Sequence, residues 1–172
     1  GHEPAFLSDT SNTSSWLSSN INDQQIMIDF TTRREFGGLQ INWLHDHHAV
    51  GFDVLLSEDG KAWEKAYSIT QNQGDVSFIR LPEAETRYLK TSLIKNYSKD
   101  GFGINEIKFL DLKNSLTTND FLIYTAKNSP IGDYPRYFLE QASYWTISGV
   151  NNDVKEAMIN EDGMVEVDKG LF

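Results

Sequence analysis

The chain has 172 residues, and its 25 acidic side chains outnumber the 15 basic ones to give a formal charge of −10 at pH 7. Such a charge repels phosphate backbones and anionic lipid surfaces, which argues against nucleic acid and membranes as partners. Hydrophobic residues make up 39% of the chain and aromatic residues 12%, so a disordered chain is excluded. Cysteine is absent, which excludes a disulfide framework and thiol chemistry.

The N-terminal part of the chain predicts a loop followed by a strand. Residues 8–20 are rich in Ser, Thr, Asn and Asp, a composition typical of a loop that Trp16 would anchor in the core. Alternating apolar residues predict a strand over residues 25–30, and the polar residues 31–35 predict a connection.

The next stretch has the pattern of a β-hairpin. Residues 39–43 alternate apolar and polar side chains, as do residues 52–56 after a polar loop at His45–His48. Residues 57–60, Ser-Glu-Asp-Gly, predict a tight turn because Asp caps locally and Gly supplies positive φ. Trp43 and Trp63, like Trp16, are expected to pack in the core.

Further short strands are predicted up to residue 112. They span residues 66–69, 76–79, 87–93 and 104–112, and Pro82 is expected to end the second of them because proline cannot donate to a sheet. Arg87 is expected either to pair with a carboxylate or to lie exposed. Roughly seven or eight strands at a spacing of about 10 residues, without a helix, predict an all-β antiparallel sandwich.

The last third of the chain has a different character. Residues 117–119 predict a linker, residues 136–143 a short helix, and residues 144–147 and 164–167 strands. We therefore expect a sandwich over residues 5–115. Residues 116–172 would be a linker and the start of a following domain, or an extension packed on the sandwich. The apolar end at Leu171-Phe172 favours a fragment of a longer protein.

Six segments in a fixed order resemble discoidin domains, also called coagulation factor 5/8 type C domains. They are Asp9 to Trp16, Gln25 to Phe30, Gly38 to Trp43, Phe52 to Trp63, Arg87 to Leu89, and Gly103 to Ile107. Among the branches of that family the chain is most similar to the family 32 carbohydrate-binding modules of bacterial carbohydrate-active proteins. The resemblance implies a galactose-binding-like jelly-roll β-sandwich with, in this chain, a C-terminal extension.

The resemblance also implies a structural calcium site. Relatives often hold the ion between the N-terminal loop and a Glu of the last strand, and the matching positions here are Asp9, Asn12, Ser14 and Glu106. Oxygen ligands of these types suit a hard cation. Thr10 and Ser14 depart from the Gly and Thr usual in the family. The alternative is a loop held by side-chain turns without an ion.

The resemblance further implies a carbohydrate site on loops at one end of the sandwich, where aromatic rings stack on sugars and polar groups bind hydroxyls. The candidates in those loops are His45, Asp46, His47, His48, Asn72, Tyr97 and Phe102. Two alternatives are open for them. Phe102 and the histidines could be structural, or the histidine loop could hold a transition metal.

The function expected from the resemblance is that of a non-catalytic module that binds a galactose-like, plant or host glycan. It would target a larger bacterial protein, through its downstream domain, to that glycan. The chain lacks a Gly-x-Ser-x-Gly motif and cysteine, which argues against an enzyme. We expect export to the periplasm, cell surface or medium. The start of the chain has no signal segment, so either a signal has been removed or the chain has been cut from a longer protein. The alternative is a structural or protein-interaction spacer without sugar binding.

Overall fold

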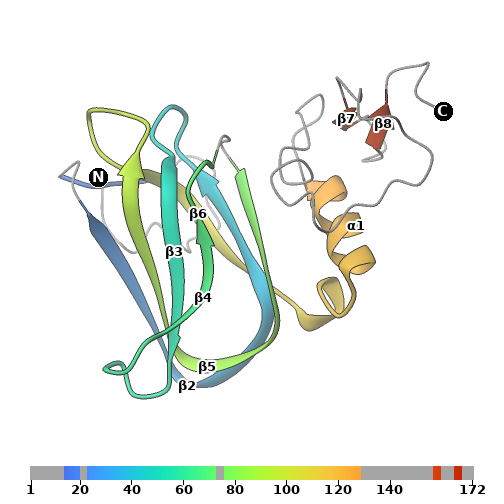
Figure 1. Ribbon diagram of the computed structural model, residues 1–172, viewed down its shortest axis with the longest axis horizontal. Helices are drawn as coiled ribbons and strands as arrows, with labels where there is room; N and C mark the ends of the chain where they lie inside the picture. Colours follow the sequence, from blue (N-terminus) through green and yellow to red (C-terminus); the bar gives the residue numbers. More distant parts are fainter. Residues whose placement is uncertain (1–13, 20–22, 73–75, 129–156, 160–164, 168–172) are drawn as a thin grey trace. The chain divides into compact units, whose positions relative to one another are not determined.

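The computed structural model shows two layers of antiparallel strands followed by a helix and a small hairpin (Figure 1). It describes residues 14–19, 23–72, 76–128, 157–159 and 165–167. Residues 1–116 and 117–172 form two separate units, and each is described by itself. Within the described residues, no helix has the length and apolar character needed to cross a membrane.

Six strands form one antiparallel sheet in the first unit. They are β1 (Trp16–Leu17), β2 (Gln24–Trp43), β3 (Ala49–Ser57), β4 (Glu64–Ile69), β5 (Val76–Asn96) and β6 (Gly103–Leu110). Their order across the sheet is β1-β6-β2-β5-β3-β4.

The sheet folds into a sandwich because β2 and β5 pass from one layer to the other. Residues 24–29 of β2 pair with residues 88–93 of β5, and this part of β5 also pairs with β3. Residues 38–42 of β2 pair instead with residues 76–80 of β5 and with β6. The expected antiparallel β-sandwich is therefore confirmed, and both long ribbons bend at the same end of it (Figure 1).

The sequence predicts that strands end at residues 31–35 and at Pro82, and both predictions are wrong. β2 continues through residues 31–35, and β5 continues through Pro82. The pairing of β2 with β5 shifts register between Asp29 and Arg34 and again between Phe36 and Gly38, so some residues at the bend have no partner in the ladder. A proline is tolerated at such a bulge because no backbone N–H has to be donated there.

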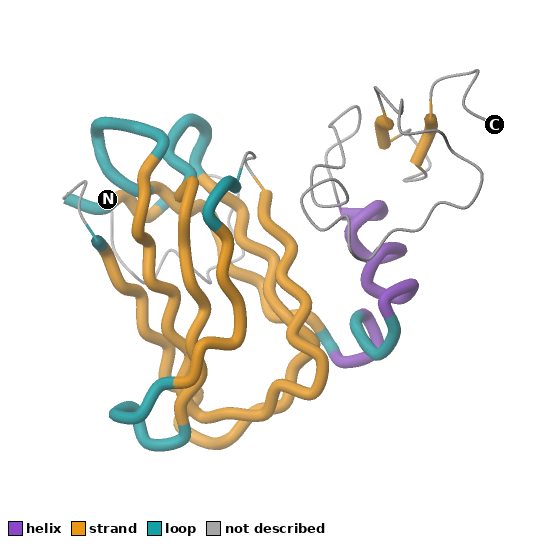
Figure 2. The backbone as a smooth tube through the Cα atoms, viewed as in Figure 1, coloured by secondary structure: helices purple, strands orange, loops and turns teal. Residues whose placement is uncertain are grey.

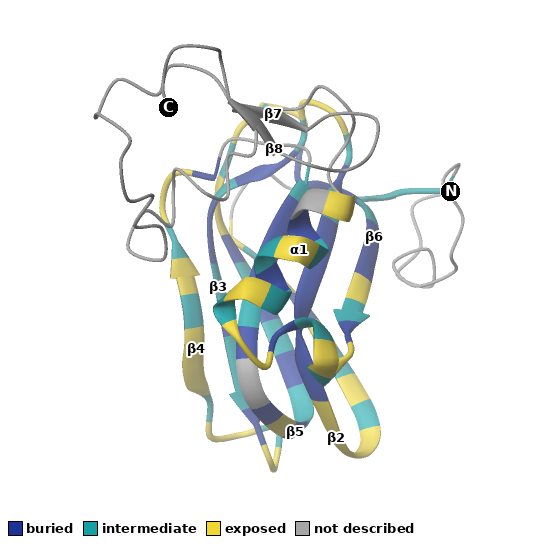
Figure 3. Ribbon diagram, turned by 90° about the vertical axis from the view of Figure 1, so that its right-hand side faces the viewer, coloured by how far each residue is buried: buried dark blue, intermediate teal, exposed yellow. Residues whose placement is uncertain are grey.

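The core follows the predicted alternation. Five apolar residues of the hairpin are fully buried, namely Leu39, Ile41, Trp43, Phe52 and Val54. Buried, intermediate and exposed residues are mixed along the strands (Figure 3), and the alternation is broken at Gln40, which is buried, and at Leu56, which is only partly buried. Trp16 is partly buried against this core, in line with its role as an anchor.

Trp63 does not pack in the core as the sequence predicts. It is only partly buried and lies outside the core cluster. The Lys90 ammonium lies 4.2 Å from the centroid of its ring, a cation–π contact. The predicted turn at residues 57–60 is confirmed, since the hydroxyl of Ser57 accepts from the backbone N–H groups of Asp59 and Gly60.

A 3-10 helix, η2 (Leu112–Asn114), follows β6, and the second unit begins with α1 (Thr118–Asn128). The predicted linker at 117–119 coincides with the start of the second unit, but it is not irregular, because Thr118 and Asn119 begin this helix and Thr117 caps it. Its hydroxyl accepts from the N–H of Asp120 at 3.1 Å, and the carboxylate of Asp120 accepts from the N–H of Thr117 at 3.1 Å.

The two short strands β7 (Ala157–Ile159) and β8 (Val165–Val167) pair with each other. β8 confirms the strand predicted over residues 164–167, apart from Met164. Met164, the predicted helix at 136–143 and the predicted strand at 144–147 lie outside the described residues.

Candidate functional site

The candidate carbohydrate residues come from loops that gather at one end of the sandwich. Residues 44–48 connect β2 to β3, residues 97–102 connect β5 to β6, and Asn72 follows β4. These loops lie together, whereas the turn between β3 and β4 lies at the opposite end (Figure 2). We call the first end the loop end.

Backbone hydrogen bonds join the two longer loops into one unit. The N–H of Leu44 donates to the carbonyl of Gly103 at 2.9 Å, and the N–H of Gly103 donates to the carbonyl of His47 at 2.9 Å. The N–H of Tyr97 donates to the carbonyl of His48 at 3.1 Å. A side chain at position 103 would meet the Cβ atoms of Leu44 and His47 at under 3 Å, so this close approach requires glycine. The loops therefore hold their side chains in fixed relative positions.

Tyr97 presents an aromatic ring at the loop end. Tyr97 is 60% exposed, so its ring is accessible to a ligand. The imidazole of His48, which is only 8% exposed, stacks against it with 4.6 Å between ring centroids and 22° between ring planes. His48 thus supports the tyrosine ring from the protein side, which lowers the entropy that Tyr97 loses when a ligand stacks on it.

Three polar side chains lie in the loop beside Tyr97. His45 and Asp46 are exposed and form an ion pair of 3.6 Å when His45 is protonated. Asp46 has a φ of 60°, a left-handed conformation that Asp tolerates. The Nδ1 of His47 lies 3.0 Å from the carbonyl oxygen of Gly101. A carbonyl only accepts, so Nδ1 carries the hydrogen and Nε2 is the acceptor of the neutral ring.

Phe102 takes a different place from Tyr97. It has no exposed surface, and its backbone N–H donates to the hydroxyl of Ser18 at 2.9 Å. Its ring belongs to the core cluster and closes the loop end of the sandwich from inside.

Asn72 is buried below the loops and is part of a hydrogen-bond network. Its Nδ2 donates to the carbonyl of Ala49 at 2.8 Å, and its Oδ1 accepts from the hydroxyl of Ser77 at 3.0 Å. The hydroxyl of Ser77 accepts in turn from the indole N–H of Trp43 at 2.8 Å. The polar atoms of the Asn72 side chain are therefore occupied by the scaffold.

The four expected calcium ligands are described only in part. Asp9 and Asn12 lie outside the described residues, and Ser14 is partly buried. Glu106 is 5% exposed, and its carboxylate forms an ion pair with Lys108 at 3.1 Å. Among the described residues, no three side chains of His, Cys, Asp or Glu come together as a metal site, either here or in the loop 45–48. The calcium site stays a prediction.

The chain is similar in structure to several carbohydrate-binding modules. Chitosan-binding module 1 of a chitosanase/glucanase from Paenibacillus sp. IK-5 matches with a TM-score of 0.59 at 19% identity, over 63% of this chain and 85% of that one. Module 2 of that enzyme, solved with chitotriose, matches with a TM-score of 0.58 at 19% identity, over 64% and 87%. CBM32-1 from a family 31 glycoside hydrolase of Clostridium perfringens matches with a TM-score of 0.56 at 20% identity, over 64% and 85%.

At these identities the likeness establishes the fold, which is that of β-sandwich carbohydrate-binding modules. No match was found among curated proteins. The sequence model of the F5/8 type C domain matches residues 1–107, more than half of the chain. The chain therefore belongs to the F5/8 type C domain family.

Proposed function

We propose that this chain is a non-catalytic module that binds carbohydrate at the loop end of the sandwich. The observation that carries the proposal is the exposed ring of Tyr97, backed by His48 and flanked by the loop 45–48. The carbohydrate-binding character of the structural neighbours supports it. Single exposed apolar side chains are common on protein surfaces, so the polar side chains of the loop 45–48 beside the Tyr97 ring are an essential part of the site.

The groups around Tyr97 suit a sugar. The C–H face of a pyranose ring stacks on the phenol ring, and the Tyr97 hydroxyl can bind the ligand at the rim. The Nε2 of His47 accepts a hydrogen bond from a sugar hydroxyl, and so does the carboxylate of Asp46. His45, exposed next to Asp46, offers a ring N–H as a donor. Phe102 and Asn72 would act only as supports, since both are buried.

The family resemblance suggests a galactose-like, plant or host glycan as the ligand. The role of the module would be to target a larger carbohydrate-active protein, exported from a bacterial cell, to that glycan. A calcium ion held by Asp9, Asn12, Ser14 and Glu106 would tie the N-terminal loop to β6. The rival function is a spacer that only packs against a neighbouring domain, and the buried ring of Phe102 is the feature that favours it.

A glycan array screened with the purified chain, with and without a calcium chelator, tests the proposal. We expect retention on at least one neutral glycan and loss of that retention in Tyr97→Ala. If a chelator abolishes binding, the calcium proposal gains support, whereas unchanged binding argues against it. A folded chain that binds no glycan would favour the spacer.

A further inference from the structure

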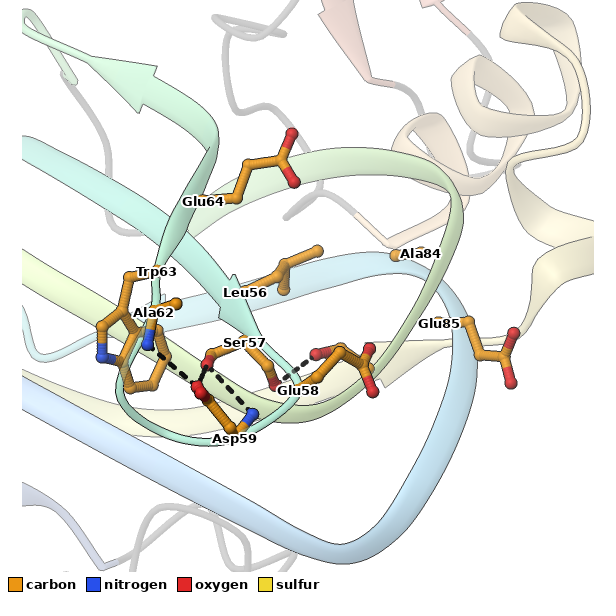
Figure 4. Close-up of a pocket in the computed structure, with 10 residues that line it drawn as sticks. Leu56, Ser57, Glu58, Asp59, Ala62, Trp63, Glu64, Ala84 and Glu85 are labelled. Atoms are coloured by element: carbon orange, nitrogen blue, oxygen red, sulfur yellow. Dashed lines mark hydrogen bonds between the residues drawn. The ribbon is translucent and has the colours of Figure 1, made fainter.

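A second concave site lies at the opposite end of the sandwich. It is a pocket of about 530 Å³ between the turn that joins β3 to β4 and the bend of β5 (Figure 4). Small-molecule sites usually have volumes of about 300–1,000 Å³, so this pocket is large enough for a ligand. None of the candidate residues of the loop end takes part in it.

The pocket has an apolar side and a polar side. Leu56, Ala62 and Ala84 contribute apolar surface, and the partly exposed indole of Trp63 forms one wall. The hydroxyl-bearing residues Ser57 and Thr86 also line the pocket. An aromatic wall next to polar groups is the combination that suits a sugar ring, whose C–H face is apolar and whose rim is polar.

The polar side is acidic. The carboxylates of Glu58, Asp59, Glu64 and Glu85 come from three segments of the chain, the turn, the start of β4 and the bend of β5. Arg33 lies 3.1 Å from Glu58 and 3.6 Å from Glu85, and the ammonium of Lys90 lies against Trp63. These two cations compensate only part of the charge of the four carboxylates. Glu64 forms no ion pair with any described residue. The pocket therefore favours a cationic ligand over a neutral or anionic one.

The walls are fixed before a ligand binds. Asp59 accepts hydrogen bonds from the N–H groups of Lys61 and Ala62 at 2.8 and 2.9 Å, which shapes the turn. The hydroxyl of Thr86 donates to the carbonyl of Ser57 at 2.7 Å and joins the bend of β5 to that turn. Such a preformed site lowers the ordering cost of binding.

The indole of Trp63 already holds an ammonium group. The Nζ of Lys90 lies 4.2 Å from its ring centroid. Lys90 does not line the pocket, so a ligand would meet the part of the indole that faces the pocket and not the part that Lys90 covers.

We propose that this pocket is a second binding site, which takes a protonated amino sugar residue such as a glucosamine unit of an oligosaccharide. The sugar ring packs against Trp63 and the apolar surface of Leu56, Ala62 and Ala84, and the ammonium group is bound by the carboxylate of Glu64. A lysine side chain of a protein is the other source of an ammonium group. Its thin chain has no ring to cover the indole and would leave most of 530 Å³ unfilled.

Residue-resolved NMR titration with chitotetraose, at low salt and at a pH where its amines are protonated, tests this site. We expect amide shifts in residues 57–64 and 84–86 that persist in Tyr97→Ala. Glu64→Gln, an exposed change that preserves shape, should weaken binding about two- to fivefold, as expected for one exposed charge pair. Trp63→Ala should weaken it about tenfold through the lost ring contact. Asp111→Asn removes an equal charge outside the pocket and should leave the affinity unchanged.

Several results would overturn the proposal. Shifts confined to residues 44–48 and 97–102 would reject the pocket but leave carbohydrate binding at the loop end intact. Equal pocket shifts with the neutral N-acetylated tetramer would reject recognition of the charge. Tighter pocket binding of a trilysine peptide would make the partner a protein. The absence of any shift would reject the site.

Discussion

Arg87 on β5 and Asp29 on β2 form a two-pronged ion pair at the point where β2 leaves the first layer of the sandwich. The Nε of Arg87 donates to Oδ1 of Asp29 at 3.0 Å, and its Nη2 donates to Oδ2 at 3.1 Å. The regular pairing of β2 with β5 is interrupted after Asp29 and Tyr88, so the ion pair joins the two strands beside the bend. The hydrogen bond from Arg87 is the main reason why the pKa of the Asp29 carboxyl lies below its ordinary value of 3.8.

This ion pair predicts a stability difference that depends on pH. A carboxyl whose pKa is lowered by folding stabilises the protein above its unfolded pKa, and the effect is lost as the pH falls through its folded pKa. Arg87→Gln should therefore unfold at a lower urea concentration than the wild type at neutral pH. The difference should be fully present well above pH 3.8 and become smaller at acid pH, as the pH falls through the lowered pKa of the Asp29 carboxyl. An equal difference at neutral and acid pH would show that Arg87 acts through packing instead.

Replacing each of two threonines of β5 by valine should change the free energy of unfolding in opposite directions. The hydroxyl of Thr91 is fully buried and has no hydrogen-bond partner among the described residues, whereas that of Thr86 donates to the carbonyl of Ser57. Thr91→Val should raise the free energy of unfolding by about 1 kcal/mol because a buried unpaired hydroxyl is removed. Thr86→Val should lower it by about 1–3 kcal/mol.

Thermal unfolding of the two threonine variants measures this contrast. Thr91→Val should raise the Tm by about 5 °C and Thr86→Val should lower it. If Thr91→Val were less stable than the wild type, its hydroxyl would have a partner that the described residues do not include.

The hydrogen bonds of Asn72 below the loop end predict that this residue stabilises the fold. Asn72→Ala removes hydrogen bonds to Ala49 and Ser77 and leaves the buried hydroxyl of Ser77 with one partner fewer. We expect a loss of about 1–3 kcal/mol in the free energy of unfolding. Gln71→Ala, at the exposed neighbouring position, should change it by less than about 0.5 kcal/mol.

Chemical denaturation of the Asn72 and Gln71 variants, together with glycan affinity measured well below the unfolding transition, separates two roles for Asn72. A stable Asn72→Ala variant with weakened glycan affinity would place Asn72 in direct contact with the ligand and would contradict its assignment to the scaffold.

Alternation of apolar residues was enough to predict the strands of the hairpin and the burial of Trp43. It did not show that β2 and β5 are continuous. A register shift depends on how two strands pair. The residues around Pro82 alone therefore do not indicate the bulge that tolerates this proline. The start of α1 was marked by Thr117-x-x-Asp120, a capping signal that the polar composition of residues 117–119 concealed.

The candidate site was predictable to a similar degree. The loops were correctly placed, because consecutive antiparallel strands bring alternate connections to one end. Which aromatic residue faces the solvent could not be predicted, since Tyr97 and Phe102 lie in one loop and differ only in which side of it they occupy. The stacking of His48 on Tyr97 and the pocket beside Trp63 depend on contacts between distant segments.

The affinity of three variants for the best glycan of the array tests the central proposal most directly. Tyr97→Ala removes the exposed ring, Tyr97→Phe keeps the ring and removes its hydroxyl, and Met27→Ala removes an equally exposed apolar side chain from β2. Calorimetric titration should show about a tenfold loss or more for Tyr97→Ala, a small loss for Tyr97→Phe, and none for Met27→Ala. Equal affinities for all three variants would contradict carbohydrate binding through Tyr97.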